Sequence, residues 1–284
     1  MKVYAADLNH DFLRPLQDIP NPPSKLWLKG NLPKGERPKV VSIVGSRKNT
    51  KYGEEVAYKL SYDLARQGII VVSGMAYGID SCAHRGCLDG GGITIAVFGT
   101  AIDHIYPSSN RGLAEKILEK GALISEYGAG EPTQSWSFTE RNRIVSGLAD
   151  AVVVIEAAAR SGTSITATHA LEQGKDVFAV PGDITRPTSV GCNRLIKQGA
   201  LPFTETEDVL GVLFPGHAKQ LKFEVFGDTE NEQKIIDAIK SGLRDGDKII
   251  ESLKFSASQF NQTVTLMEIK GMIRPLGANH WALV

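Results

Sequence analysis

The chain has 284 residues and carries 32 Lys and Arg against 32 Asp and Glu, so its formal net charge is zero. This length suggests one large domain, or one domain with a small companion. Hydrophobic residues make up 42% and charged residues 23%, a globular composition that excludes a disordered chain, a collagen and a disulfide scaffold. The balanced charge does not favour a globally basic nucleic-acid binder, although a local positive groove is enough to neutralise phosphates.

The sequence also indicates where the protein resides. Its three cysteines, Cys82, Cys87 and Cys192, form no CxxC pair and fit reduced cytosolic thiols better than a disulfide framework or a zinc site. The segment Met1 to Arg14 lacks the apolar stretch of a signal peptide. The apolar run Ala151 to Ile155 is far shorter than the roughly 20 residues of a membrane span. We therefore expect a cytoplasmic protein without a membrane partner.

Four stretches of the chain differ in character. Residues 1–38, which include Pro20, Pro22 and Pro23, are expected to form an irregular N-terminal arm. Residues 39–212 alternate apolar β-branched runs with helical patterns and are expected to form the core. Residues 213–230 are expected to be a linker, and residues 231–284 a small C-terminal domain.

Within the core, seven apolar runs are predicted to be strands: Val40–Val44, Ile69–Val72, Ile93–Phe98, Leu123–Ile124, Ala151–Ile155, Val177–Val180 and Leu201–Phe203. The patterns between them are predicted to be helices: Tyr52–Arg66, Ile79–Leu88, Leu113–Leu118, Phe138–Leu148, Ile165–Gln173 and Cys192–Lys197. Strands that are apolar throughout are buried on both faces, which is typical of a parallel sheet covered by helices. We predict an α/β fold with a Rossmann-like, doubly wound and mostly parallel sheet, whose ligands bind at the carboxyl ends of the strands.

Glycine and small hydroxyl residues follow five of these strands. The loops are Gly45-Ser46, Ser73-Gly74, Gly99-Thr100, Ser161-Gly162-Thr163 and Pro181-Gly182. Glycine lets the backbone approach a ligand closely, and Ser or Thr caps the following helix, whose free N–H groups attract anions. We therefore predict a phosphate-binding rim. No GxGxxG, GxxxxGK[ST] or GxSxG motif and no metal-ligand spacing occurs, so we expect no cofactor and no metal.

Basic residues beside the strand ends supply the charge for such a rim, Arg through bidentate contacts and Lys as a point charge. They are Arg47, Lys48, Arg141, Arg143, Arg160, Lys175, Arg186, Arg194 and Lys197. Arg141 and Arg143 are two positions apart in a predicted helix and point about 200° apart, so one of the two is expected to be structural. Which of them faces a ligand stays open. Lys175 directly precedes a buried strand, a place where a solvated lysine is equally common.

The C-terminal region has the pattern of a winged helix. Its predicted helices are Glu232–Ile239, Ile249–Leu253 and Ala257–Met272, and a hairpin follows over residues 271–283. In a winged helix that reads DNA the third helix is basic, whereas Ser256 to Leu266 contains no Lys or Arg. We therefore expect this domain to have a protein-contact or structural role rather than to read a DNA groove.

An ordered set of motifs resembles the DNA processing protein A family (DprA/Smf). The motifs are Gly45-Ser46-Arg47, Ser73-Gly74-Met75-Ala76-Tyr77-Gly78-Ile79-Asp80, Arg141-Asn142-Arg143, Ser161-Gly162-Thr163, Val180-Pro181-Gly182 and Ser189-x-Gly191-x-Asn193-x-Leu195-Ile196-x-x-Gly199-Ala200. The resemblance covers about residues 26–212 and implies a core that binds single-stranded DNA. It further implies protection of incoming DNA in natural transformation, help in loading the RecA recombinase, and action as a homodimer without nucleotide hydrolysis.

The resemblance also implies the site residues. Arg47 and Lys175 are carried over as the main phosphate-binding charges, and Ser161, Gly162 and Thr163 as a phosphate cradle at a helix start. The remaining members of the site are Gly45, Ser46, Ser73, Gly74, Arg141, Asn142 and Arg143, with Tyr77 as a base-stacking candidate for which a core role is equally plausible. Residues near Leu195–Phe203 are candidates for the dimer interface.

Two departures from the family pattern stand out. Many members begin with a helical domain, of which only the segment around Leu26–Leu32 corresponds to anything here. The core is also not basic, since residues 40–210 hold 16 Lys and Arg against 19 Asp and Glu. We therefore expect a narrow positive pocket whose affinity for DNA depends strongly on salt.

Two other functions are compatible with parts of the sequence. The Ser161-Gly162-Thr163 region also resembles phosphoribohydrolases of nucleoside monophosphates, but Thr166 stands where that family has its acid/base Glu, and Thr is no general base near neutral pH. We accordingly expect no enzyme activity. A third alternative is an adaptor in which the C-terminal domain does the binding.

Overall fold

The computed structural model describes residues 2–159, 161–215, 227–277 and 279–283. The chain divides into two compact units, Met1–Ala218 and Lys219–Val284, and each is described here by itself. Arg160 and residues 216–226 of the expected linker lie outside the described residues. The assignment of domain roles to residues 39–212, 213–230 and 231–284 stays a prediction.

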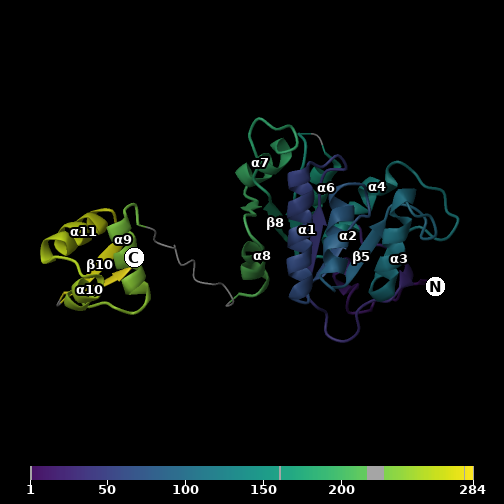
Figure 1. The fold of residues 1–284 in the computed structure, drawn as a ribbon. Helices are drawn as coiled ribbons and strands as arrows, with labels where there is room; N and C mark the ends of the chain where they lie inside the picture. Colours follow the sequence, from purple (N-terminus) through teal and green to yellow (C-terminus); the bar gives the residue numbers. More distant parts are fainter. Residues whose placement is uncertain (1, 160, 216–226, 278, 284) are drawn as a thin grey trace. The chain divides into compact units, whose positions relative to one another are not determined.

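The first unit is built on a nine-stranded sheet with the order β1-β2-β6-β5-β4-β3-β7-β8-β9 (Figure 1). The strands are β1 (Val3–Ala5), β2 (Trp27–Gly30), β3 (Val40–Val44), β4 (Ile70–Ser73), β5 (Thr94–Phe98), β6 (Ala122–Ser125), β7 (Ala151–Val154), β8 (Asp176–Ala179) and β9 (Leu201–Pro202). The seven strands from β6 to β9 along this order are parallel, whereas β1 and β2 are antiparallel to their neighbours. The predicted α/β class with a mostly parallel sheet is confirmed.

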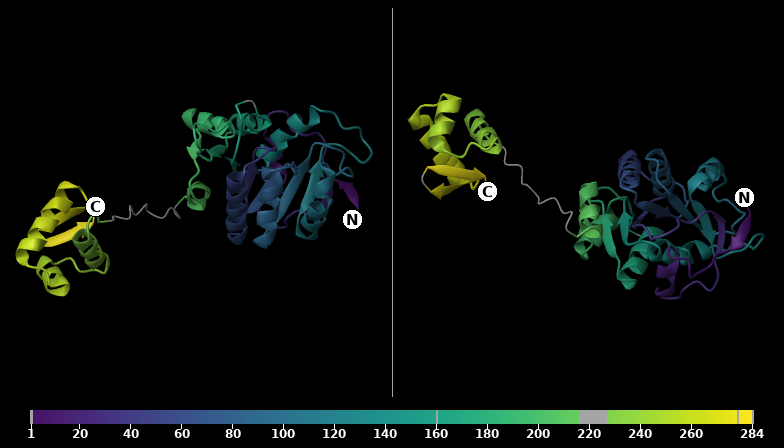
Figure 2. Two further views of the ribbon diagram at one scale, coloured as in Figure 1. Left: turned by 45° about the horizontal axis from the view of Figure 1, so that its top comes forward. Right: turned by 90° about the horizontal axis from the view of Figure 1, so that it is seen from below.

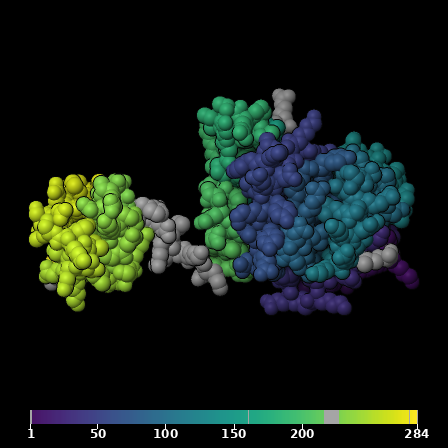
Figure 3. All heavy atoms as spheres, in the orientation of Figure 1, coloured from purple at the N-terminus to yellow at the C-terminus, as the bar shows by residue number. Residues whose placement is uncertain are grey.

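Helices cover both faces of this sheet, as the views in Figure 2 show. They are η1 (Arg14–Gln17), α1 (Lys51–Arg66), α2 (Ile79–Asp89), η2 (Ser108–Asn110), α3 (Arg111–Lys120), α4 (Ser137–Glu140), α5 (Asn142–Gly147), α6 (Gly162–Glu172), α7 (Val190–Lys197) and α8 (Thr206–Leu213). Alternate residues of each strand face opposite layers, because side chains alternate along a strand. In β3, Val41 and Ile43 pack with α1, α2 and α8, while Val40 and Val44 pack with α5, α6 and α7. On one face the side chains of α1 and its neighbours form a continuous layer (Figure 3).

The N-terminal residues correct one expectation. Instead of an irregular arm, they contribute β2, which pairs with β6, and β1, which pairs with β2. Phe12, Leu13 and Leu16 are fully buried in the same apolar cluster as α5. Sequence patterning does not reveal these elements, because strands of three and four residues and one turn of 3₁₀ helix are too short to produce a periodicity.

Two helices also differ from their predicted form. The single helix expected over Phe138–Leu148 is divided into α4 and α5, and Arg141 lies between them. Helix α8 was not predicted. It begins with a capping box in which the Glu205 and Asp208 side chains each accept a backbone N–H of the other residue.

The order of the strands reverses between β3 and β7. Strands β4, β5 and β6 follow β3 on one side, and β7, β8 and β9 lie on its other side. In open parallel sheets the crevice beyond the carboxyl ends at such a reversal is where ligands bind. The loops after β3 and β7, which contain Gly45–Lys48 and Ser161–Thr163, meet at this point.

The second unit contains α9 (Glu230–Lys240), α10 (Gly246–Leu253), α11 (Ala257–Ile269) and the antiparallel strands β10 (Ile273–Gly277) and β11 (His280–Leu283). Ile235, Ile249 and Phe260, one from each helix, are fully buried in its core. Three helices and a hairpin are therefore present as expected, while their designation as a winged helix stays a prediction.

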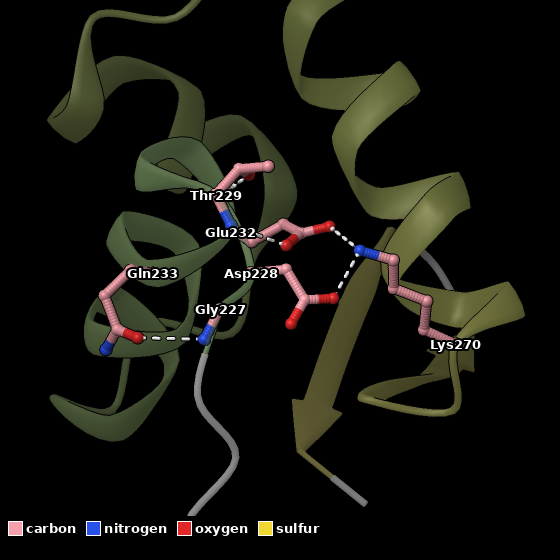
Figure 4. Close-up of polar contacts among 6 residues, drawn as sticks. All are labelled: Gly227, Asp228, Thr229, Glu232, Gln233 and Lys270. Atoms are coloured by element: carbon pink, nitrogen blue, oxygen red, sulfur yellow. Dashed lines mark hydrogen bonds and ion pairs between the residues drawn. The ribbon is translucent and has the colours of Figure 1, made fainter.

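Lys270 joins two segments of this second unit (Figure 4). Its Nζ lies 2.8 Å from a carboxylate oxygen of Asp228 and 2.8 Å from one of Glu232. Glu232 in turn forms a capping box with Thr229 at the start of α9. The positive charge of Lys270 is thus paired with two carboxylates of the same unit.

No helix of the described part is long and apolar enough to cross a membrane. Cys82, Cys87 and Cys192 are buried free thiols. Burial raises the pKa of Cys87 and of Cys192 to about 12, which keeps both thiols protonated and unreactive.

Candidate functional site

An open pocket of about 850 Å³ lies at the strand reversal. Its walls come from the loops after β3, β4 and β7 and from the α4–α5 junction. The expected site residues that line it are Gly45, Ser46, Arg47, Gly74, Arg141, Asn142, Ser161, Gly162 and Thr163. The sequence thus identified segments that are distant along the chain and adjacent in the fold.

The start of α6 lines this pocket, and it differs in one respect from the start of α1, which follows the loop that carries Arg47. The start of α1 is already occupied by the buried carboxylate of Glu156, which accepts hydrogen bonds from Thr50 N–H at 2.9 Å and from the Thr50 hydroxyl at 2.6 Å. The start of α6 is capped by Ser161, whose Oγ accepts from Thr163 N–H at 3.2 Å. A Cβ added at Gly162 would meet no atom within 4 Å, so this helix start is open. An external anion therefore has α6, not α1, as its helix-end site.

Close packing between two loops shapes the wall beside Arg47. Gly78 has a φ of +79°, and a Cβ there would lie 2.3 Å from the carbonyl oxygen of Ser46. A side chain at this position would displace the loop that follows β3. Glycine is required here both for its conformation and for the close approach of the two backbones.

Arg47 and Lys48 are the exposed cations of the pocket. Within the described residues neither side chain forms an ion pair, and the Arg47 guanidinium carbon lies 5.7 Å from the centre of the Phe138 ring. Among the described residues, the pocket is lined by three basic side chains, Arg47, Lys48 and Arg141, and by one acidic side chain, Asp80. Its balance is positive in a unit that is not basic overall.

Arg141 has a structural position. Its side chain is only 4% exposed and donates hydrogen bonds to the carbonyl oxygens of Gly74 and Val97. Burial lowers its pKa to about 10, which still leaves it charged at neutral pH, and the nearby Asp80 opposes this shift. Asp80 is itself buried, which raises its pKa, and it accepts a hydrogen bond from Ala76 N–H at 3.2 Å. The guanidinium therefore ties the loop after β4 to strand β5.

Arg143 is also engaged, and it does not line the pocket. Its two terminal nitrogens donate to the two carboxylate oxygens of Glu126 at 2.8 and 2.7 Å. The expectation that Arg143 lines the same pocket as Asn142 is wrong, because consecutive residues of a helix point about 100° apart and Arg143 faces Glu126 in the loop after β6. Neither Arg141 nor Arg143 offers a free guanidinium to a ligand.

Lys175 lies beyond the amino ends of the parallel strands, opposite the pocket at their carboxyl ends. It directly precedes β8, whose carboxyl end faces the pocket, so Lys175 is at the amino end. Burial lowers the pKa of Lys175. Two residues at the same end of the sheet also act on this pKa: Asp150, which precedes β7, raises it, and Arg37, which precedes β3, lowers it. Arg47 and Lys175 therefore do not form one phosphate site.

Ser73 and Tyr77 complete the set of expected residues. Ser73 is buried and donates its hydroxyl to the Ile43 carbonyl at 2.6 Å, so it joins β4 to β3 rather than facing a ligand. Tyr77 is half exposed and lines a narrow cleft beside the pocket with Tyr106 and Phe138. Tyr106 and Phe138 were missed in the sequence, where no motif marks them.

Comparison with known proteins identifies the family of this chain. The model of a protein family described as DNA recombination-mediator protein A matches residues 4–213. The chain belongs to this family. It is 44% identical over 195 residues to the DNA processing protein DprA of Streptococcus pneumoniae, which covers 69% of this chain and 68% of that protein. It is 46% identical over 171 residues to protein Smf of Escherichia coli, covering 60% of this chain and 46% of the relative.

Two solved structures share the fold of the first unit. The crystal structure of S. pneumoniae DprA superposes with a TM-score of 0.68 at 40% identity and covers 74% of each chain. DNA processing protein A from Helicobacter pylori, a structure that addresses a single-stranded DNA binding mode, has a TM-score of 0.68 at 28% identity. It covers 75% of this chain and 96% of that one. The expected family resemblance is confirmed.

Proposed function

We propose that this chain binds single-stranded DNA in the pocket at the β3/β7 reversal. The observation that carries the proposal is the proximity of Arg47, a cation that forms no ion pair among the described residues, to the open N-terminus of α6. Together they form an anion site at the place where a doubly wound sheet binds ligands. A positive groove that follows the backbone is how proteins hold single strands without sequence preference.

The wider role follows from family membership. As a recombination mediator of the cytoplasm, the protein would protect incoming single strands and help to load the RecA recombinase during natural transformation. We further propose a homodimer through residues near Leu195–Phe203. Edge strand β9 lies in this segment, and Leu201 in it is partly exposed. Light scattering that detects only monomer at high concentration would contradict the dimer.

The phosphoribohydrolase alternative has little support from the geometry. Thr166 lines the pocket at the place of the missing Glu, and it provides no base. Asp80, the one carboxylate in the described part of the lining, is buried beside Arg141 and accepts a hydrogen bond from the Ala76 N–H. Incubation with AMP and measurement of the released base tests this alternative directly.

The main experiment is fluorescence anisotropy of a labelled dT oligomer over a salt series. We expect the full chain to bind, and Arg47→Ala to weaken binding and to reduce the salt slope by about one unit. Arg66→Ala is the matched control, because Arg66 is an exposed arginine at the far end of α1. A wild-type chain that does not bind at low salt would overturn the proposal.

A further inference from the structure

The narrow cleft beside the pocket has two tyrosines at its rim. Tyr77 comes from the loop after β4 and Tyr106 from the loop after β5, and their side chains are 50% and 48% exposed. The cleft measures about 20 Å³ and shares Arg47, Gly74 and Phe138 with the larger pocket. Two large rings thus stand in solvent next to the anion site.

Both rings are carried by well-fixed parts of the structure. Tyr106 packs against Phe138, with ring centres 5.4 Å apart and planes inclined by 55°. The loop of Tyr77 is held by Asn110, whose amide donates to the Met75 carbonyl at 2.9 Å, and by the bond from Ala76 N–H to Asp80. Because Asn110 and Asp80 are buried and Phe138 is partly buried, we take the exposure of the rings to be a stable feature of this surface.

We propose that Tyr77 and Tyr106 form a base-stacking platform for the nucleotides whose phosphates bind beside Arg47, an inference that rests on the proposed function. The ligand class is the unpaired nucleobase. A cleft of about 20 Å³ has room for about one water molecule, so bases lie across the exposed ring faces rather than inside it. Every base has an aromatic face, so such stacking tolerates any sequence.

The platform also provides a reason for selecting single strands. In a duplex the faces of the bases are stacked on their neighbours and are not available to a protein ring. An unpaired strand exposes them while its phosphates reach Arg47. The phosphate site by itself would accept either form, since phosphates are common to both.

The test compares two labelled strands with equal numbers of phosphates, a dT oligomer and an abasic oligomer of the same length. Wild type is expected to bind dT more tightly than the abasic strand. Tyr106→Ala and Tyr77→Ala are each expected to weaken dT binding about tenfold, with little effect on the abasic strand and no change in the salt slope. Tyr106→Phe and Tyr77→Phe keep the ring and should retain the affinity for dT.

Tyr62→Ala is the matched control, because Tyr62 is an exposed tyrosine on α1 away from the pocket. Equal binding of dT and abasic strands by wild type would overturn the platform while leaving the DNA-binding pocket intact. A loss of affinity in the alanine variants that is equal for the dT and the abasic strand would also overturn the platform and leave the DNA-binding pocket intact. Failure of wild type to bind either strand would overturn the proposed function together with this inference.

Discussion

The carboxylate of Glu156 and the residue Thr50 form a two-point contact at the start of α1. One oxygen accepts the Thr50 hydroxyl at 2.6 Å and the other accepts the Thr50 N–H at 2.9 Å. This contact anchors the end of the loop Gly45–Thr50, which carries Arg47. Glu156 therefore supports the proposed anion site without lining the pocket.

Replacing Glu156 tests this relationship. Glu156→Ala is expected to lower the free energy of unfolding by at least about 2 kcal/mol, because it removes two hydrogen bonds to a buried charged group. It should also weaken binding of single strands, because the Arg47 loop loses its anchor. Urea unfolding and anisotropy measure the two effects. Glu156→Gln should be intermediate, and Glu54→Ala, an exposed carboxylate of α1, serves as control. Wild-type DNA affinity in Glu156→Ala would contradict the anchoring role.

Arg143 and Arg47 are expected to respond in opposite ways to the same substitution. Arg143→Gln should lower the free energy of unfolding by about 1–3 kcal/mol, because Glu126 is left half-buried without its partner, and it should leave the salt slope of DNA binding unchanged. Arg47→Gln should change stability by no more than about 0.5 kcal/mol and should reduce the slope. A reduced slope in Arg143→Gln would show that its guanidinium leaves Glu126 to reach the strand.

Lys175 tests whether DNA contacts the amino ends of the strands as well as their carboxyl ends. Lys175→Gln is expected to leave the affinity for a short dT oligomer within about twofold of wild type, because the lysine lies at the amino ends of the strands while the anion site lies at the carboxyl ends. The comparison is anisotropy beside Arg47→Gln at the same salt. A loss of DNA affinity as large as that of Arg47→Gln would mean that the bound DNA extends around the sheet to the amino ends of its β-strands.

His84 makes stability depend on pH. Its Nδ1 lies 2.7 Å from the hydroxyl of Thr94, which donates to the Val71 carbonyl, while its buried Nε2 has no partner among the described residues. Burial lowers the pKa of His84 from 6.5 to about 3. The unfolded chain therefore binds a proton that the folded chain excludes. The stabilisation is full above about pH 6.5 and is lost as the pH falls towards 3.

Unfolding by urea at several pH values measures this effect. His84 alone should reduce the free energy of unfolding by up to about 1.4 kcal/mol for each pH unit below 6. His84→Gln should flatten the dependence, whereas His104→Gln, which replaces an exposed histidine, should not. An unchanged pH dependence in His84→Gln would exclude this histidine as the source.

Much of this arrangement follows from the sequence. Runs such as Val40–Val44 and Ala151–Val154 predict buried parallel strands, and the glycine and hydroxyl residues after them predict the pocket, because these signals are local. The position of Lys175 could also be predicted from the sequence, since a residue directly before a parallel strand lies at the amino end of that strand. The partners of the arginines were not readable. Arg141 contacts the carbonyl oxygens of Gly74 and Val97, which are 67 and 44 positions away. Because every residue has a carbonyl group, the sequence does not indicate which ones an arginine will contact.

The antiparallel strand β2 has a consequence for shortened forms of the protein. It covers the edge of β6, a strand whose four residues are all buried. A fragment that begins at residue 39 would leave the N–H and C=O groups of that edge unpaired and would empty the space filled by Phe12 and Leu13. Unpaired apolar edges recruit other strands, so such a fragment would self-associate. The first thirty residues therefore act as a built-in guard against aggregation.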